Sequence, residues 1–150
     1  MSKKVRNADR LCAFTDGVYA IVITLLVLEL KPPHVAGLDD RQLLEDLGKQ
    51  VHTFVAYLLS FVVVGALWWW HHTTFADVEL RGDRTIVLNL AHILAVTLLP
   101  FTAALAGRYA GDGIAVALFG TSLLLSAVSL AALRSHAVRA VAAPTAAAAQ

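Results

Sequence analysis

The chain has 150 residues, of which 58% are hydrophobic and 15% are charged, with a formal net charge of +1 and a mean hydropathy of +0.68. Such a composition leaves too little polar surface to cover a water-soluble domain of this size, so we predict an integral membrane protein. The small net charge, without a basic patch, argues against a nucleic-acid partner. The only cysteine, Cys12, excludes an internal disulfide.

Four apolar segments are each long enough to cross a hydrocarbon core of about 30 Å as a helix. They lie at residues 11–30, 51–70, 85–106 and 113–133. We therefore expect an all-α protein with a single transmembrane domain over residues 1–136. The remaining residues, 137–150, are rich in alanine and low in complexity, and we predict that this tail is disordered.

The first segment carries an aspartate, Asp16, about two turns from its start. A carboxylate on a membrane helix is costly and is a functional candidate by default, although it could also cap a frayed helix start near the headgroups. The same segment has a nearly apolar stripe at helical spacings of three and four, with a single hydroxyl. This stripe, which either lines a narrow pore or packs against another helix, consists of Gly17, Ile21, Thr24, Leu25 and Leu28.

Lysine and arginine are distributed unevenly along the chain. Eight of the 12 lie in the N-terminal flank, in the loop after the second segment and in the tail, and the other four lie in the first loop and at Arg108. Because cytoplasmic loops carry the excess of positive charge, we expect a multi-pass protein of the cell membrane with both termini in the cytoplasm. In the first loop, Leu43, Leu44 and Leu47 fit an amphipathic turn at the membrane interface.

Polar side chains from three segments lie at a similar depth. Asp16 and Asn89 are near the cytoplasmic starts of their segments, and Trp68 is near the cytoplasmic end of the second. We predict that they form an interhelical network with His71 and Arg10, because polar groups in a low-dielectric layer must be paired. Arg10 and Asp16 point in different directions on one helix, so each is expected to reach a neighbouring helix or a second subunit.

The sequence carries no recognisable metal or catalytic motif. His71 and His72 are adjacent, so their side chains point about 100 degrees apart on a helix, and no His-x-x-x-His or Glu-x-x-His spacing occurs. The motifs of hydrolases and of phosphate-binding loops are also missing from the sequence. We therefore expect no enzyme activity, no metal and no cofactor.

Three motifs, in order, resemble the transmembrane protein 175 family of potassium-permeable channels, and together they cover about residues 6–106. The first, RLCAFTDGVYAI at residues 10–21, is similar to the family pattern Arg-x-x-x-Phe-Ser-Asp, with Thr15 keeping the hydroxyl of the usual serine. The second is SFVVVGALWWWHHTTF at residues 60–75. The third is NLAHILAVTLLPFTAAL at residues 89–105.

This resemblance implies a homotetrameric channel that prefers potassium to sodium, with the first helix lining the ion path. Ile21, Leu25 and Leu28 match the family's constricting aliphatic rings. Thr24 matches a ring of hydroxyls. An apolar ring selects by the cost of partial dehydration and closes by dewetting, so the same residues would be both filter and gate. The expected partners are other copies of the chain, the lipid bilayer and permeant potassium ions.

A second hypothesis comes from the number of segments. Bacterial members of the family look like six-helix subunits, whereas this sequence contains four segments. The alternative is therefore a non-conducting membrane interaction protein or accessory subunit, a truncated homologue of the channel. In that case the polar network would only hold the helices together.

Overall fold

The computed structural model describes residues 3–33, 39–76 and 83–142, with side chains over 10–33, 39–75 and 83–140. Within these ranges the chain forms helices joined by turns, and it has no strand. In chain order the helices are α1 (Lys3–Val27), α2 (Asp40–Lys49), α3 (Val51–Ala76), α4 (Asp83–Thr97), α5 (Leu99–Arg108) and α6 (Gly113–Ala142).

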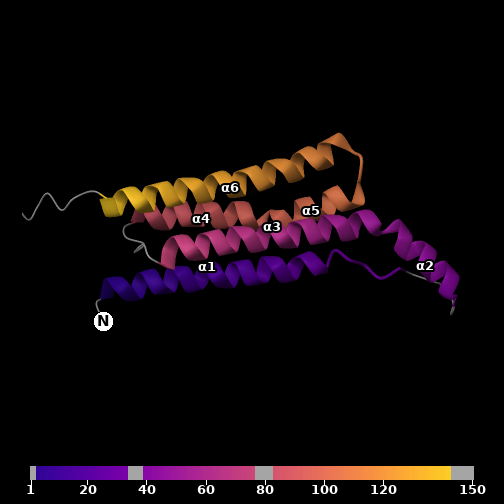
Figure 1. The fold of residues 1–150 in the computed structure, drawn as a ribbon, viewed down its shortest axis with the longest axis horizontal. Helices are drawn as coiled ribbons and strands as arrows, with labels where there is room; N and C mark the ends of the chain where they lie inside the picture. The colour runs from indigo at the N-terminus through magenta and orange to yellow at the C-terminus, as the bar shows by residue number, and fades with distance from the viewer. Residues whose placement is uncertain (1–2, 34–38, 77–82, 143–150) are drawn as a thin grey trace, which may run out of the picture.

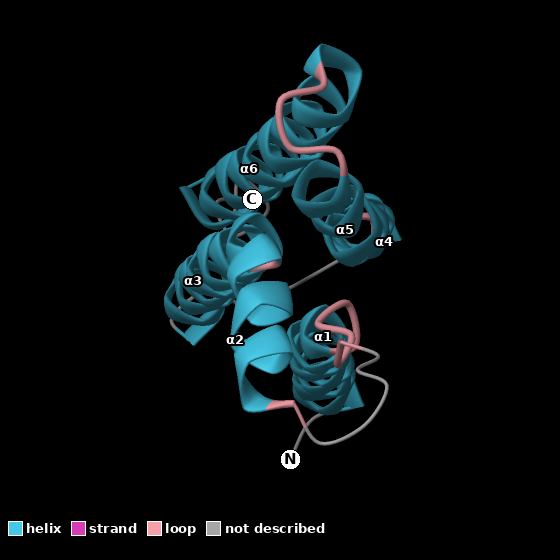
Figure 2. Ribbon diagram, turned by 90° about the vertical axis from the view of Figure 1, so that its right-hand side faces the viewer, coloured by secondary structure: helices cyan, strands magenta, loops and turns pink. Residues whose placement is uncertain are grey.

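The long helices lie side by side along the longest axis of the molecule, and the short α2 projects beyond one end (Figure 1). In the view of Figure 2, α1 and α6 lie at opposite sides of the bundle, with α3 and the α4–α5 pair between them. α1 packs most extensively against α3, and α6 packs against α4 and α5. We call the end with the start of α1 and the end of α6 the terminal end, and the opposite end the α2 end.

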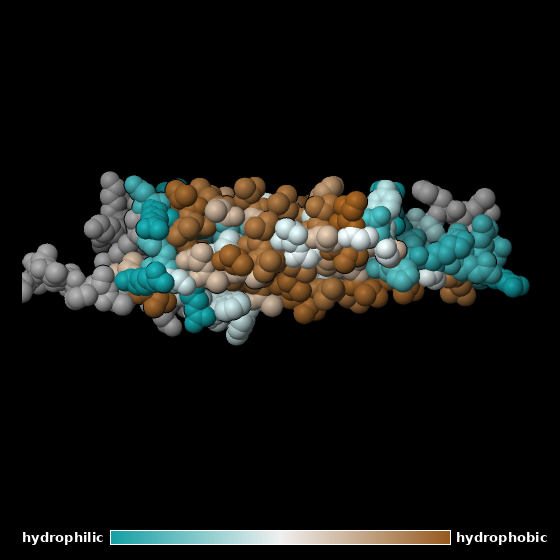
Figure 3. Space-filling view, turned by 90° about the horizontal axis from the view of Figure 1, so that it is seen from above, coloured by the Kyte–Doolittle hydropathy of each residue, from teal (hydrophilic) through white to brown (hydrophobic). Residues whose placement is uncertain are grey.

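Four segments of the described chain are long and apolar enough to span a membrane. They are Arg10–Val27, Val51–Phe75, Asp83–Arg108 and Gly113–Ala140. In the space-filling view an apolar belt covers the middle of the molecule, and hydrophilic residues gather at its two ends (Figure 3). This distribution matches a bilayer core between two headgroup layers, so the predicted class of all-α membrane protein is confirmed.

The third predicted segment is a pair of helices rather than one continuous helix. α4 ends at Thr97 and α5 begins at Leu99, with Pro100 in the first turn of α5. Proline has no backbone N–H, and its ring clashes with the carbonyl group four residues earlier, so a helix is interrupted just before it. The two helices together still make one span.

Some helix ends differ from the predicted boundaries. α1 begins at Lys3 and ends at Val27, so it lies further toward the N-terminus than the predicted 11–30. α6 continues to Ala142, into the tail that we expected to be disordered, because alanine is the strongest helix former. The end of that tail, 143–150, lies outside the described residues.

α2 lies in the first loop, where the amphipathic turn was predicted. The side chain of Asp39 accepts hydrogen bonds from the backbone N–H groups of Arg41 (3.0 Å) and Gln42 (3.3 Å), which caps the helix. Leu43, Leu44 and Leu47 are all exposed. This exposure suits a helix that lies on a membrane surface, and that placement stays a prediction.

The closest helix contact that involves a glycine lies between α3 and α5. A Cβ atom added to Gly107 would be only 3.1 Å from the Cα atom of Thr53 and 3.3 Å from the Cβ atom of Ala56. The Thr53 hydroxyl also donates a hydrogen bond of 3.5 Å to the Gly107 carbonyl. Because Gly107 has no side chain, the backbones of α3 and α5 can approach each other closely, as membrane helices do at glycine residues.

Gly107→Val should separate α3 from α5 and lower the free energy of unfolding by about 1–3 kcal/mol, the usual cost of overpacking. An SDS titration of the detergent-solubilised protein, followed by circular dichroism, would measure this loss. Gly120→Val is the matched control, because a Cβ atom there meets nothing within 4 Å. Equal losses in the two variants would contradict the close contact.

Candidate functional site

The stripe predicted on the first helix lies on the surface of the protomer. Ile21, Leu25 and Leu28 are 59%, 42% and 66% exposed, and Leu28 lies in the turn directly after α1. Thr24 and Gly17 are exposed on the same side of α1. A row of large aliphatic side chains at this depth must face either lipid or another helix, so the stripe is available to a second copy of the chain.

The opposite face of α1 is buried in the protomer. Tyr19, Val22 and Leu26, at spacings of three and four, are each only 1% exposed. They pack in the main core with apolar side chains from the other spans, which include Val64, Leu67, Val96, Leu99 and Leu130. One face of α1 thus anchors the helix, and the other carries the stripe.

The hydroxyl of Thr24 is hydrogen-bonded to the backbone of its own helix. It donates to the carbonyl groups of Ile21 at 2.8 Å and of Ala20 at 3.1 Å. A hydroxyl has one proton and two lone pairs, so this bond uses the proton and leaves the lone pairs directed away from the backbone. Among the stripe side chains, Thr24 is therefore the one that can offer an oxygen to a cation.

The Asp16 carboxylate is hydrogen-bonded to the indole of Trp68. The Trp68 Nε1–H group donates to Asp16 Oδ1 over 2.9 Å, which joins α1 to α3. Asp16 is only partly buried. Because an indole can only donate and an ionised carboxylate can only accept, the pair is chemically matched.

A second set of bonds joins α3, α4 and α1. The His71 Nε2–H group donates to Asn89 Oδ1 (3.0 Å), and Asn89 Nδ2 donates to the hydroxyl of Thr15 (2.8 Å). Thr15 then donates to the carbonyl group of Leu11 (2.9 Å). The side chains of His71, Asn89 and Thr15 are at most 1% exposed, so the two bonds between them pair groups that have no access to water.

A third set of bonds extends the network to α6. The Nδ1 atom of His92 lies 2.9 Å from the Ser129 hydroxyl, which itself donates to the carbonyl group of Ser126. Because the Ser129 proton is already used, His92 Nδ1–H is the donor, and His92 Nε2 accepts from the Tyr19 hydroxyl at 2.6 Å. The rings of His71 and His92 are stacked 5.9 Å apart, which places the second and third sets in contact.

The predicted network residues are therefore brought together only in part. Trp68 pairs with Asp16, and His71 pairs with Asn89, as two separate sets of hydrogen bonds. Arg10 is exposed and makes no ion pair or hydrogen bond with the side chains that the structure describes. Its direction differs from that of Asp16 by about 120 degrees on an ideal helix, which carries it away from the interior of the protomer.

Sequence reasoning missed the roles of Thr15, Tyr19 and Ser129, and it left His92 unassigned. The available signal was helical spacing. Tyr19 follows Thr15 by four residues, and His92 follows Asn89 by three, so each lies on the same helix face as the residue before it. Among the described residues, no group of three or more His, Cys, Asp or Glu side chains is placed to hold a metal ion.

The sequence profile of the family described as endosomal/lysosomal potassium channel TMEM175 matches residues 10–100. The chain belongs to the TMEM175 family. This membership confirms the resemblance that the three motifs indicated, and it makes the chain a member of a family of multi-pass membrane proteins.

Individual TMEM175 relatives agree with this assignment. A potassium channel of Streptomyces collinus is 34% identical over 140 residues, covering 90% of this chain and 66% of that protein. The mouse endosomal/lysosomal proton channel TMEM175 is 38% identical over 100 residues, covering 63% of this chain and 20% of the mouse protein. The chain thus spans just under two thirds of the Streptomyces relative and a fifth of the mouse protein.

A solved TMEM175 structure has the same fold. The crystal structure of a lysosomal potassium-selective channel TMEM175 homolog from Chamaesiphon minutus superimposes with a TM-score of 0.81 at 31% sequence identity. The superposition covers 88% of this chain and 72% of that one. The arrangement of the helices is therefore that of the family.

Tyr19→Phe should lower the free energy of unfolding by about 1 kcal/mol or more, because it leaves the Nε2 atom of buried His92 without a donor. Thermal unfolding of the detergent-solubilised protein would measure the change. Tyr57→Phe is the matched control, since the Tyr57 hydroxyl makes no hydrogen bond with the described residues. A Tyr19→Phe variant as stable as the control would contradict the assigned bond.

Proposed function

We propose that the chain is the pore-forming subunit of a potassium-permeable cation channel. In this proposal α1 helices from a homotetramer surround the ion path, and Ile21, Leu25 and Leu28 form its apolar constriction. The observation that carries the proposal is the exposed aliphatic stripe on α1, on the face opposite to the one that anchors the helix. Likeness to proteins named potassium channels supports it.

The chemistry of the stripe suits filtering and gating. A narrow ring of aliphatic side chains admits a cation only after part of its hydration shell is removed, and potassium loses water at a lower cost than sodium. The Thr24 oxygen, whose proton is held by its own helix, would replace part of that shell. A small decrease in diameter would empty the ring of water and stop conduction.

The polar network would position the pore helix. Thr15, Asp16 and Tyr19 lie on α1 and are bonded to Asn89, Trp68 and His92 on α3 and α4. These bonds would fix the rotation of α1, so that the stripe of each copy points toward the ion path. We further propose that the terminal end faces the cytoplasm in the cell membrane, as the lysine and arginine distribution predicts.

The same exposed face supports a second candidate function. A stripe of aliphatic side chains on a membrane helix can pack against a partner helix without enclosing an ion path. The chain would then be a non-conducting interaction protein or accessory subunit. Ion flux through the purified protein distinguishes the two functions.

Leu25→Ala should widen the constriction and lower the selectivity for potassium. Purified protein in liposomes with a potassium or a sodium gradient would be compared with the variant, and we expect sodium flux to rise several-fold while the preference for potassium decreases. Leu124→Ala is the matched control, because Leu124 is 64% exposed on α6 and lies outside the stripe. If the parent protein forms a stable tetramer but conducts neither potassium nor sodium, the channel proposal is wrong.

Thr24→Val keeps the shape of the side chain and removes its oxygen. If the hydroxyls replace hydration water, potassium flux should fall about tenfold or more, since each lost oxygen contact is worth about 1 kcal/mol. Thr97→Val is the control, because Thr97 is an exposed threonine on α4 that is bonded to its own helix in the same way, at 2.9 Å from the Leu94 carbonyl. Unchanged flux in Thr24→Val would remove the hydroxyl ring from the proposal.

A further inference from the structure

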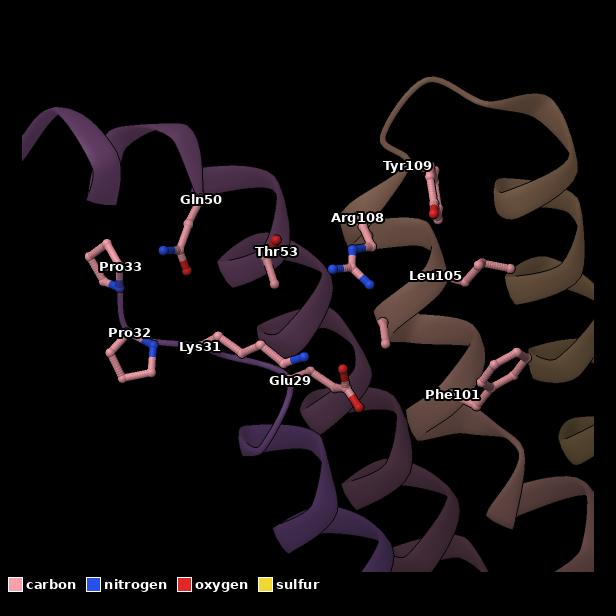
Figure 4. Close-up of a pocket in the computed structure, with 11 residues that line it drawn as sticks. Glu29, Lys31, Pro32, Pro33, Gln50, Thr53, Phe101, Leu105, Arg108 and Tyr109 are labelled. Atoms are coloured by element: carbon pink, nitrogen blue, oxygen red, sulfur yellow. The ribbon is translucent and has the colours of Figure 1, made fainter. Parts of the chain in front are cut away.

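A pocket with unpaired charges lies at the α2 end of the bundle. It has a volume of about 540 Å³ and is bounded by the segment after α1, by the junction of α2 and α3, and by α5. Glu29 and Lys31 reach it from the segment after α1, and Arg108 and Tyr109 reach it from the end of α5 (Figure 4). The volume is within the usual range for a small-molecule site.

Glu29 belongs to this pocket rather than to the stripe. It lies in the turn that follows α1, where its backbone N–H group donates a hydrogen bond of 3.4 Å to the carbonyl group of the buried Leu26. A small cavity nearby, which shares Glu29, Thr53 and Ala104 with this pocket, is also lined by Leu26. Glu29 therefore faces α3 and α5.

The three charged groups of the pocket lack protein partners among the described side chains. The ion pairs between described side chains join Arg41 to Glu45 and Lys49 to Asp46, and both pairs lie on α2, outside the pocket. In Figure 4 the side chains of Glu29, Lys31 and Arg108 extend into the same hollow. Two cations and one carboxylate thus converge on a space large enough for a ligand that carries both signs of charge.

The position of the pocket indicates a lipid. Three spans have ends at this level, at Val27, Val51 and Arg108, so the pocket lies at the depth of the headgroups. Tyr109, a residue type typical of the membrane interface, is beside it. Phe101, which is 65% exposed, is also a lining residue and lies about two helical turns before Arg108, on the side of the apolar belt, where an acyl chain would lie.

We propose that this pocket binds the headgroup of an aminophospholipid, phosphatidylethanolamine. Arg108 and Lys31 would bind the phosphate through charge-assisted hydrogen bonds, and Glu29 would accept from the primary ammonium group. Phosphatidylglycerol has no ammonium group for Glu29. Phosphatidylcholine has a quaternary ammonium group that cannot donate a hydrogen bond. The charge pattern therefore favours the ethanolamine headgroup over both.

Native mass spectrometry of the detergent-solubilised full chain would compare binding of the three lipids. We expect phosphatidylethanolamine to bind most tightly. Arg108→Gln should weaken its binding about tenfold, and Glu29→Gln should reduce it to the level of phosphatidylglycerol while leaving phosphatidylglycerol binding unchanged. Arg41→Gln, an exposed arginine on α2, is the matched control and should change nothing. Circular dichroism and gel filtration would verify that each variant is folded and assembled.

Other outcomes would overturn the proposal. Equal binding of the three lipids would remove the headgroup selectivity. Equal lipid affinity in Arg108→Gln and Arg41→Gln would contradict the proposed site. An intact oligomer that binds none of the three lipids would contradict it as well. Competition by glycerophosphoethanolamine at the concentrations at which the lipid binds would overturn the membrane source and identify a soluble ligand of the same chemistry. None of these readouts depends on ion conduction.

Discussion

The hydrogen bonds on the inner face of α1 are the constraint on which the rest of the structure depends. Thr15 accepts from Asn89, Asp16 accepts from Trp68, and Tyr19 donates to His92. Inside a membrane, lipid chains are as apolar as leucine, so burial of aliphatic side chains alone would not decide which face of α1 points inward. Directional polar contacts do decide it, and they leave the aliphatic stripe on the outside.

This arrangement connects the stability of the protomer to the proposed pore. A constriction formed by side chains of several copies depends on the rotation of each α1, and that rotation depends on groups that an ion would never touch. His92 extends the dependence to α6 through Ser129, so a change in the packing of α6 can reach α1. The arrangement also separates two surfaces: the stripe faces outward, while Glu29, in the turn after α1, lines the pocket at the α2 end.

Much of the fold follows from the sequence, and the candidate site follows less completely. The four spans were predictable because hydropathy over a bilayer-length window is a local property. The depth of Asp16, Trp68 and Asn89 was also predictable, because helical rise converts position into height. The partners were not. Trp68 pairs with Asp16, whereas His71 pairs with Asn89, and Arg10 stays outside.

The sequence by itself determined the class of the protein, its spans, its family motifs and the existence of a two-faced first helix, because periodicity assigns residues to helix faces without reference to other helices. The tertiary structure alone decided which polar groups meet, where the third span is interrupted, and that Glu29 shares a pocket with Arg108. The physical reason is that these contacts join residues far apart in the chain, such as Tyr19 and His92, whose separation depends on how whole helices are placed and rotated.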